Sequence, residues 1–274
     1  MLDMHSTVKL NSGHEMPLLG FGVFQVKEGD ECERAVRDAL EAGYRHIDTA
    51  AVYGNEAQVG AAIAESGIPR EQLFVTSKLW NTDHGYDNAL RAYDASLKRL
   101  KLDYLDLYLL HWPVAELRLD SWRALEQLSV DKRVRSIGVS NFLTPHLKEL
   151  AKVAKVLPAV NQLELTPFLQ RREAVALCSE LGIALESYSP LTHGKRLTHP
   201  LLLELGAALQ RSPAQVLLRW GIQKGFIILP KSVQPARIAE NSAVFDFALD
   251  AAAMQRLDAL EEGLVTGWDP ETQP

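Results

Sequence analysis

The sequence predicts an α/β fold, a (β/α)8 barrel formed by one domain over residues 1–274. Short β-like runs alternate with amphipathic helical stretches along the whole chain, and no low-complexity linker interrupts them. There are eight such runs, and they are too apolar to face water. Strands of this kind pair in parallel beneath covering helices, and closing the sheet into a barrel removes both of its edges.

The predicted strands are short and are separated by helical patterns. In chain order they are LLGFGVF (core 19–24), RHIDTA (45–50), LFVTSK (73–78), YLDLYLLH (104–111), VRSIGVSN (134–141), AVNQLE (159–164), IALESYS (183–189) and FIILP (226–230). Between them, apolar residues recur at three- and four-residue spacing, which is typical of helices that lie on a sheet. Examples are Val36, Ala39 and Leu40 in the first helix, Leu90, Tyr93, Leu97 and Leu100 in the third, and Leu147, Leu150 and Val153 in the fifth.

A hairpin is expected before the first strand. Residues 8–18 (VKLNSGHEMPL) contain two short apolar runs around Asn11-Ser12-Gly13, which is a typical turn sequence. We expect this short N-terminal β-hairpin to plug the bottom of the barrel.

An open, doubly wound sheet is the alternative architecture. The segment GFGVFQ (20–25) lacks the third glycine of the dinucleotide-binding fingerprint, and no Walker sequence occurs. The barrel is therefore the preferred fold.

Composition limits the possible partners. A net charge of -6 argues against nucleic acid as the main partner, because phosphate binding needs a basic face. No run approaches the length of a membrane span, and the N-terminus MLDMHSTVKL lacks an apolar signal core. We expect a cytoplasmic monomer that acts on a small molecule. Cys32 and Cys178 lie in two different predicted helices without metal-ligand spacing, so we interpret both as buried thiols.

Polar residues gather where the predicted strands end. Strands two to eight end at or near Asp48, Lys78, His111, Ser140 and Asn141, Gln162, Tyr188 and Ser189, and Lys231 and Ser232. Taken singly, each of these residues has an ordinary structural explanation, such as a helix cap or a surface ion pair. Together they predict a site, because burying Asp, Lys and His near one another costs stability unless they pair, and active sites of barrels lie at this end.

The same segments carry a family resemblance. The motifs are GYRHIDTAAVYGNE (43–56), SKLWN (77–81), LDLYLLHWP (105–113), IGVSNF (137–142), NQLELTP (161–167), SYSPL (187–191) and LPKSVQPARIAEN (229–241). In this order and at these intervals the sequence resembles the aldo-keto reductase family. The resemblance implies a (β/α)8 barrel, NADPH as the cofactor, and Asp48, Tyr53, Lys78 and His111 as the four catalytic residues.

The resemblance implies reduction of aldehydes or ketones to alcohols, which needs a hydride on carbon and a proton on oxygen. Tyr53 would donate the proton. We expect the ammonium of Lys78 to lower the pKa of Tyr53 from its ordinary value of about 10. Asp48 would hold Lys78 charged, and His111 would orient the carbonyl oxygen.

The resemblance also implies the cofactor contacts. Ser140, Asn141 and Gln162 would bind the nicotinamide carboxamide, and Tyr188 would stack on the ring, with Ser189 and Leu191 nearby. Lys231, Ser232, Val233 and Arg237 would hold a monoester phosphate at a helix N-terminus, and Glu240 and Asn241 would contact the adenine.

Two features bear on the substrate. Thr166 stands where relatives usually have a histidine, and the segments 114–119 and 265–274 are short. Such segments form lids only when they are long enough to fold over the site, so we expect an open cleft. Phe24, Trp80, His111 and Trp112 would bound this cleft, and it would accept many small carbonyl compounds of the sugar aldehyde, methylglyoxal or keto acid type.

Two other classes of function are considered. His46, Asp48 and His111 are suitable ligands for the metal of a hydrolase, since His46 and Asp48 share one face of a strand. A barrel that binds NADPH as a regulatory subunit is the second alternative.

Overall fold

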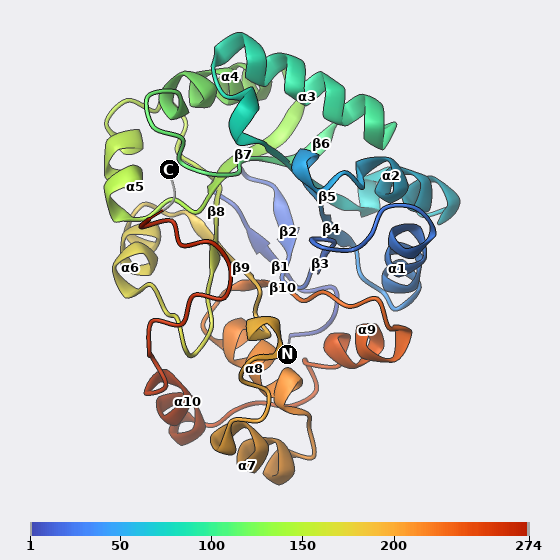
Figure 1. Cartoon of the computed structure of the whole chain (residues 1–274), viewed down its shortest axis with the longest axis vertical. Coiled ribbons are helices and arrows are strands. Elements are labelled where there is room, and N and C mark those ends of the chain that lie inside the picture. Colours follow the sequence, from blue (N-terminus) through green and yellow to red (C-terminus); the bar gives the residue numbers. More distant parts are fainter. Residues whose placement is uncertain (1, 273–274) are drawn as a thin grey trace.

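The computed structural model describes residues 2–272 and contains the predicted barrel (Figure 1). Its parallel sheet runs in chain order from β3 to β10. The strands are β3 (Phe21–Gly22), β4 (His46–Asp48), β5 (Phe74–Leu79), β6 (Leu105–Leu110), β7 (Val134–Ser140), β8 (Val160–Glu164), β9 (Ala184–Tyr188) and β10 (Ile227–Leu229). The first and last strands are joined where Gly20 N donates to Ile228 O at 2.9 Å and Ile228 N donates to Leu18 O at 2.9 Å. The eight predicted strands are therefore confirmed, most of them shorter than the runs that predicted them.

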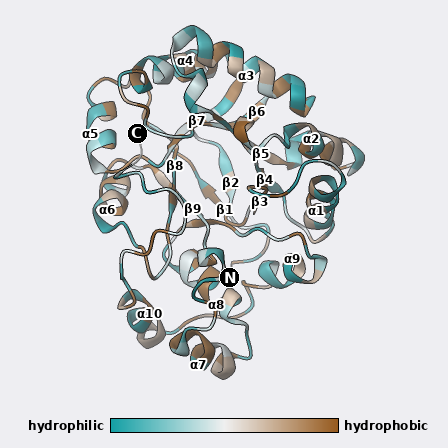
Figure 2. Ribbon diagram, viewed as in Figure 1, coloured by the Kyte–Doolittle hydropathy of each residue, from teal (hydrophilic) through white to brown (hydrophobic). Residues whose placement is uncertain are grey.

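Helices surround the sheet. They are α1 (Asp30–Glu41), α2 (Glu56–Glu65), α3 (Tyr86–Leu100), α4 (Arg118–Val130), α5 (Thr144–Ala151), α6 (Arg172–Glu180), α7 (Pro200–Leu209), α8 (Pro213–Gln223), α9 (Pro235–Ser242) and α10 (Ala251–Asp258). Their inner faces carry the predicted apolar residues, and both cysteines are buried free thiols in α1 and α6. Figure 2 shows hydrophilic residues mostly on this outer ring. Within residues 2–272, no helix is long and apolar enough to cross a membrane.

The prediction for Val153 is wrong. Helix α5 ends at Ala151, the Val153 backbone N–H donates to Leu150 O in the turn that follows, and 59% of the valine is exposed. The apolar spacing of the sequence continues beyond the end of the helix. The helix itself stops at Ala151, because the chain turns there towards the next strand.

The predicted hairpin is present and closes the bottom of the barrel. Strands β1 (Thr7–Lys9) and β2 (Glu15–Pro17) are antiparallel, and Gly13 in the turn between them has φ 88°. The turn is tied to the barrel by Asn11 Nδ2, which donates to Pro158 O at 2.9 Å. Met16 is fully buried. It belongs to an apolar cluster of Leu10, Leu18, Phe74, Leu107, Leu109, Ala159, Val160 and Ile227.

The chain after α10 crosses the end of the barrel that lies opposite the hairpin. In Figure 1 this segment lies in front of the strands, whereas the hairpin lies behind them. Residues 259–272 form turns and irregular structure rather than a helix or strand. This end is called the mouth below, and it is where the strand-end residues lie.

Candidate active site

Parallel strands bring the four residues implied by the resemblance to one place. Asp48 ends β4, Lys78 is the penultimate residue of β5, and His111 follows β6 directly. Tyr53 ends a short helical turn, Ala51–Tyr53, that follows β4. Since neighbouring strands of a parallel sheet end at the same edge, residues far apart in the sequence meet at the mouth.

Lys78 is the centre of this group. Its fully buried ammonium donates to Asp48 Oδ1 at 2.5 Å, to Thr49 O at 3.0 Å and to Tyr53 Oη at 3.4 Å. Burial alone would lower the pKa of Lys78, but the charge and hydrogen bond of Asp48, together with Tyr53 and Glu186, outweigh burial and hold the pKa above its ordinary value. The lysine is therefore charged, and Asp48 is the counter-ion that makes its burial possible.

The expectation from the sequence is that Lys78 lowers the pKa of Tyr53 below its ordinary value of about 10. This expectation is wrong, because the pKa of Tyr53 is raised once all of its surroundings are included. Burial raises the pKa of Tyr53 to about 12, Lys78 acts to lower it, and Asp48 acts to raise it again. Because Asp48 cancels much of the lysine's field, burial decides the outcome. Tyr53 is therefore a phenol that keeps its proton at neutral pH.

His111 lies against Tyr53. The two ring centroids are 5.6 Å apart, with an angle of 75° between the planes. Burial, together with the charges of Lys78 and His84, holds the pKa of His111 well below its ordinary value. A neutral imidazole carries one N–H, so His111 and Tyr53 can both donate a hydrogen bond to a single oxygen atom.

A further buried carboxyl lies beneath this group. Gln162 Nε2 donates to Asp48 Oδ2 at 2.9 Å and to Glu186 Oε2 at 2.6 Å, so that the amide bridges the two acids. Burial and the neighbouring charge of Asp48 raise the pKa of Glu186 to about 8. Sequence reasoning missed Glu186, although an acid two residues before Tyr188 in an apolar strand was a usable signal, because both side chains share the inner face of β9.

The metal-hydrolase grouping is not formed. His46 Nε2 lies 3.5 Å from Glu186 Oε1 and 3.3 Å from Thr76 Oγ1, and burial lowers the pKa of His46 to about 3. Asp48 is already paired with Lys78. In the part of the chain that the structure describes, no three His, Cys, Asp or Glu side chains gather to hold a metal ion. This geometry gives no support to the alternative based on His46, Asp48 and His111.

Four of the residues expected beside the nicotinamide form one hydrogen-bonded group: Ser140, Asn141, Gln162 and Tyr188. Tyr188 Oη donates to Asn141 Oδ1 at 2.9 Å, and Asn141 Nδ2 donates to His111 O at 3.0 Å. Ser140 Oγ donates to Gln162 O at 2.9 Å. Ser189 Oγ and His193 Nε2 lie 2.9 Å apart in the loop after β9, where the partly buried Leu191 packs on the core.

The residues expected at the phosphate lie between β10 and the start of α9. Ser232 Oγ accepts from Gln234 N at 3.1 Å, and Lys231 Nζ donates to Gln25 O at 3.4 Å. Arg237 lies in the first turn of α9, and Val233 precedes it. Glu240 and the buried Asn241 follow in the next turn of α9. Within residues 2–272, neither Lys231 nor Arg237 has a carboxylate within 4.0 Å. Both cations are therefore available to an anion.

Aromatic residues line the mouth as expected. The Phe24 ring lies 5.1 Å from that of Tyr53, and the Trp80 ring lies 5.3 Å from that of His111. A third indole was not predicted. Trp268, in the C-terminal tail, lies 6.1 Å from Trp80 and 5.9 Å from Trp112 between ring centroids.

The expectation that the tail is too short to cover the mouth is therefore wrong, because the residues up to 272 already reach it. The last two residues of the segment 265–274 lie outside the described residues. The backbone N–H of Thr266 donates to Glu164 at 3.1 Å, and Arg171 forms ion pairs with Asp269 at 3.0 Å and Glu271 at 2.9 Å. These contacts draw the tail across the barrel. Helix α4 begins at Arg118, within the segment 114–119, so the loop between His111 and this helix is short, as predicted.

Thr166 has a local structural role. Its Oγ1 accepts from Phe168 N at 3.1 Å, and its backbone exchanges hydrogen bonds with Leu169. The threonine thus stabilises a tight turn after β8, and it takes no part in the hydrogen bonds of the four central residues.

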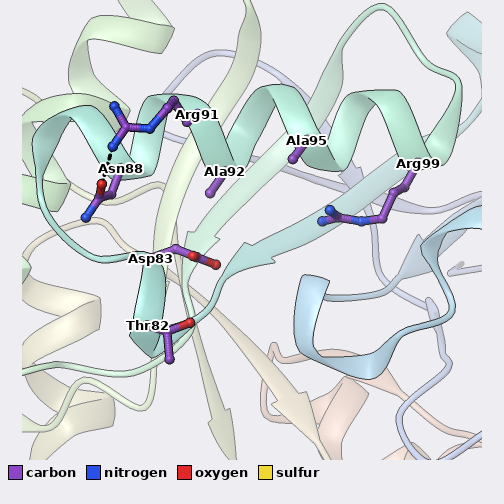
Figure 3. A pocket seen from close by; sticks show the side chains of 7 residues that line it. All are labelled: Thr82, Asp83, Asn88, Arg91, Ala92, Ala95 and Arg99. Carbon is purple, nitrogen blue, oxygen red and sulfur yellow. Dashed lines mark hydrogen bonds between the residues drawn. The ribbon is translucent and has the colours of Figure 1, made fainter.

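A surface hollow of about 350 Å³ lies outside the mouth (Figure 3). Side chains from one face of α3 and from the turn before it line it: Thr82, Asp83, Asn88, Arg91, Ala92, Ala95 and Arg99. A second hollow beside it, which shares Asp83 and Arg99 with the first, is lined in part by Trp80. Neither is lined by the four central residues, and the second shares Trp80 with the aromatic wall of the mouth.

The chain is similar to known reductases over nearly its whole length. A model described as the aldo/keto reductase family matches residues 18–262. Glyoxal reductase of Bacillus subtilis (strain 168) is 48% identical over 268 residues, which cover 98% of this chain and 97% of that protein. Morphine 6-dehydrogenase of Pseudomonas putida is 48% identical over 278 residues, which cover 96% of this chain and 94% of that protein.

A solved structure agrees with this relationship. The crystal structure of a Bombyx mori aldo-keto reductase in complex with NADP has a TM-score of 0.91 to this chain at 36% identity, covering 98% of this chain and 97% of that one. The fold, the strand-end residues and these similarities agree, and the chain belongs to the aldo/keto reductase family of oxidoreductases.

Proposed function

We propose that the protein reduces aldehydes and ketones to alcohols with NADPH as the reductant and Tyr53 as the proton donor. One observation carries this proposal. The phenol of Tyr53 lies 3.4 Å from a buried ammonium, that of Lys78, which is itself paired with Asp48. Such a cluster is costly for stability and is suited to moving one proton.

The proton balance follows from these contacts. When a hydride reaches the carbonyl carbon, the carbonyl oxygen becomes an alkoxide and takes the phenolic proton of Tyr53. The phenolate that remains lies next to Lys78, whose positive charge stabilises it. A pKa of about 12 does not prevent this transfer, because an alkoxide is a much stronger base than a phenolate.

His111 would orient the substrate. Its neutral imidazole lies edge-on to Tyr53, so its N–H and the phenol can hold one carbonyl oxygen between them. Positioning of this kind lowers the entropic cost of reaction and fixes the face of the carbonyl that is exposed.

NADPH would supply the hydride when bound. The residues that would hold its nicotinamide are Ser140, Asn141, Gln162, Tyr188, Ser189 and Leu191, and those that would hold its phosphate and adenine are Lys231, Ser232, Val233, Arg237, Glu240 and Asn241. The fit of the second group rests on Lys231 and Arg237, two cations beside a helix N-terminus. The relative from Bombyx mori that was solved with NADP supports this choice of cofactor.

We infer a broad range of small carbonyl substrates. The walls around Tyr53 and His111 are aromatic, from Phe24, Trp80 and Trp112, and aromatic surfaces discriminate weakly between apolar groups. Relatives at the same identity are named for glyoxal and for morphine, two compounds of very different size.

The direct test is Tyr53→Phe. We expect kcat for a panel of aldehydes with NADPH to fall by a factor of roughly 10² to 10⁴, because positioned acid catalysis typically contributes that much to the rate. The Kd for NADPH, measured by fluorescence titration, should stay within a few fold because the hydroxyl acts in proton transfer. Turnover close to that of the unaltered enzyme would contradict the role of Tyr53. NADPH binding by the unaltered protein without turnover of any carbonyl compound would instead favour a regulatory barrel.

A further inference from the structure

Trp268 is an unusual residue in the C-terminal tail. Its side chain is 60% exposed, although it lies about 6 Å from two other indoles, those of Trp80 and Trp112. The planes are tilted by 40° and 47°, so the three rings are not stacked on one another. Trp112 is 5% exposed, so most of the apolar surface that the three rings leave in water at the mouth of the barrel belongs to Trp268.

This surface is continuous with the catalytic group. Trp80 lies 5.3 Å from the ring of His111, and His111 lies 5.6 Å from that of Tyr53. A carbonyl oxygen held by Tyr53 and His111 would therefore have its substituent directed past Trp80 towards Trp268. A flat apolar substituent would cover the exposed indole face and remove it from water.

Backbone-to-backbone hydrogen bonds hold the tail to the barrel as far as Leu264, whose N–H donates to Phe168 O at 3.0 Å, and none is formed with the barrel between Thr266 and residue 272. Residues 259–272 contain no helix or strand, so the position of the Trp268 indole depends on side-chain anchors. Two of these flank it in sequence. Thr266 is bonded to the buried Glu164, and Asp269 and Glu271 both pair with Arg171.

Arg171 is well suited to be the stronger anchor. Its side chain is 9% exposed, whereas those of Asp269 and Glu271 are 30% and 64% exposed. A largely buried guanidinium needs its partners, and it holds them better than a surface arginine does because water screens the pairs less.

We propose that Arg171 is a positioning residue that latches the C-terminal tail across the mouth, so that Trp268 forms a wall selective for carbonyl compounds with a flat apolar group. This inference rests on the proposed reductase function. Arg171 itself touches neither Tyr53 nor His111 in the hydrogen bonds of the described chain. Its side-chain hydrogen bonds in the described chain go to the tail, to Asp269 and Glu271, although its charge is also felt by Tyr188.

Kinetics with two substrates test the latch. In Arg171→Met we expect KM for 4-nitrobenzaldehyde to rise about tenfold, while kcat for this substrate and both constants for methylglyoxal change less than about twofold. Trp268→Ala should give the same pattern, and the double variant should be no worse than either single one, because both remove the same wall. An equal rise of KM for both aldehydes, or additive losses in the double variant, would overturn the proposal.

The control is Arg37→Met. Arg37 also pairs with two carboxylates, Glu33 and Glu65, but on α1 and α2. It should leave the ratio of the two KM values unchanged, whereas a change equal to that of Arg171→Met would mean that loss of any such pair loosens the pocket. If Arg171→Met fails to fold, Asp269→Asn removes one of the pairs at a partly exposed position and should raise the same KM by a smaller factor.

A second measurement does not depend on activity. Acrylamide quenching of the emission due to Trp268, obtained as the difference from a Trp268→Phe variant, should increase in Arg171→Met because the freed tail exposes the indole further. Unchanged quenching would overturn the latch. Absence of turnover in the unaltered enzyme would overturn the proposed function, and the quenching would still report on the tail.

Discussion

The two ends of the barrel are built from the same strands and have opposite characters. The bottom is apolar and is sealed by the hairpin around Met16. The mouth contains a buried lysine, Lys78, and two buried acids, Asp48 and Glu186. Burial of apolar surface stabilises the fold, whereas burial of charge costs stability unless each group is paired. The bottom of the barrel therefore contributes to the stability of the fold, whereas the mouth contains groups whose burial is costly and which we propose to be catalytic.

The change in character occurs within single strands. Leu107 and Leu109 of β6 belong to the apolar cluster at the bottom, and His111 continues the same face two residues later. In β9, Ala184 packs against the same apolar cluster, and Glu186 follows it on the same face by the same interval. Since alternate residues of a strand share a face, the barrel interior changes from apolar to polar over an interval of two residues.

Lys78→Met should have the largest effect, because it damages both activity and stability at the mouth. We expect kcat to fall by at least about 10², since the Tyr53 phenolate loses its stabilising charge. The free energy of unfolding should fall by roughly 3–5 kcal/mol, because Asp48 is left buried without its counter-ion. Steady-state kinetics and urea unfolding measure the two effects. A variant that keeps its turnover would show that Lys78 is a structural residue only.

Met16→Ala tests the opposite end. Truncating this fully buried side chain should lower the free energy of unfolding by roughly 2–5 kcal/mol, because a cavity is left among the leucines of the plug. The values of kcat and KM should not change, since the hairpin lies at the far end from Tyr53. Lys9→Ala, at an exposed position of β1, is the control and should have little effect on either property. A change in kcat for Met16→Ala would mean that the two ends are coupled.

The bottom and the strands were predictable because they follow from apolar periodicity and from the Asn11-Ser12-Gly13 turn. The residues at the mouth were predictable from strand ends together with family motifs. Trp268 was not, because its place depends on ion pairs between Arg171 and residues about a hundred positions away. The pKa of Tyr53 was not either, because its direction results from burial, Lys78 and Asp48 acting against one another, and a sequence gives no burial.

Glu186→Gln should change how stability depends on pH. A carboxyl whose folded pKa is raised to about 8 binds its proton more tightly in the folded state, so the free energy of unfolding falls as pH rises towards 8. The buried histidines act in the opposite direction, but their folded pKa values are lowered, to about 3 for His46 and about 4 for His84, and their effect is complete by about pH 6.5. Between pH 6.5 and 8, Glu186 therefore acts without opposition from them.

Urea unfolding at both ends of that range measures the effect. We expect the unaltered protein to lose about 1–2 kcal/mol from pH 6.5 to 8 and Glu186→Gln to lose much less, because a neutral amide has no proton to release. Equal losses in the two proteins would mean that Glu186 is not protonated in the fold. The comparison also shows whether the second acid of the mouth is neutral, which would leave one buried negative charge opposite Lys78.

Arg237→Ala should give the smallest effect, because Arg237 lies outside the barrel where water screens its charge. If it contacts the 2′-phosphate that distinguishes NADPH from NADH, a charge-assisted hydrogen bond contributes roughly 1.5 kcal/mol or somewhat more, which corresponds to about tenfold in affinity. We therefore expect the Kd for NADPH to rise about tenfold and the Kd for NADH to change less than about twofold. Fluorescence titration of both cofactors measures this, and Arg256→Ala, which removes an exposed arginine paired with Glu204, is the control. Equal losses for the two cofactors would contradict the role of Arg237. The predicted loss is small beside that for Lys78, because an exposed charge is already stabilised by water, whereas a buried one depends wholly on its protein partners.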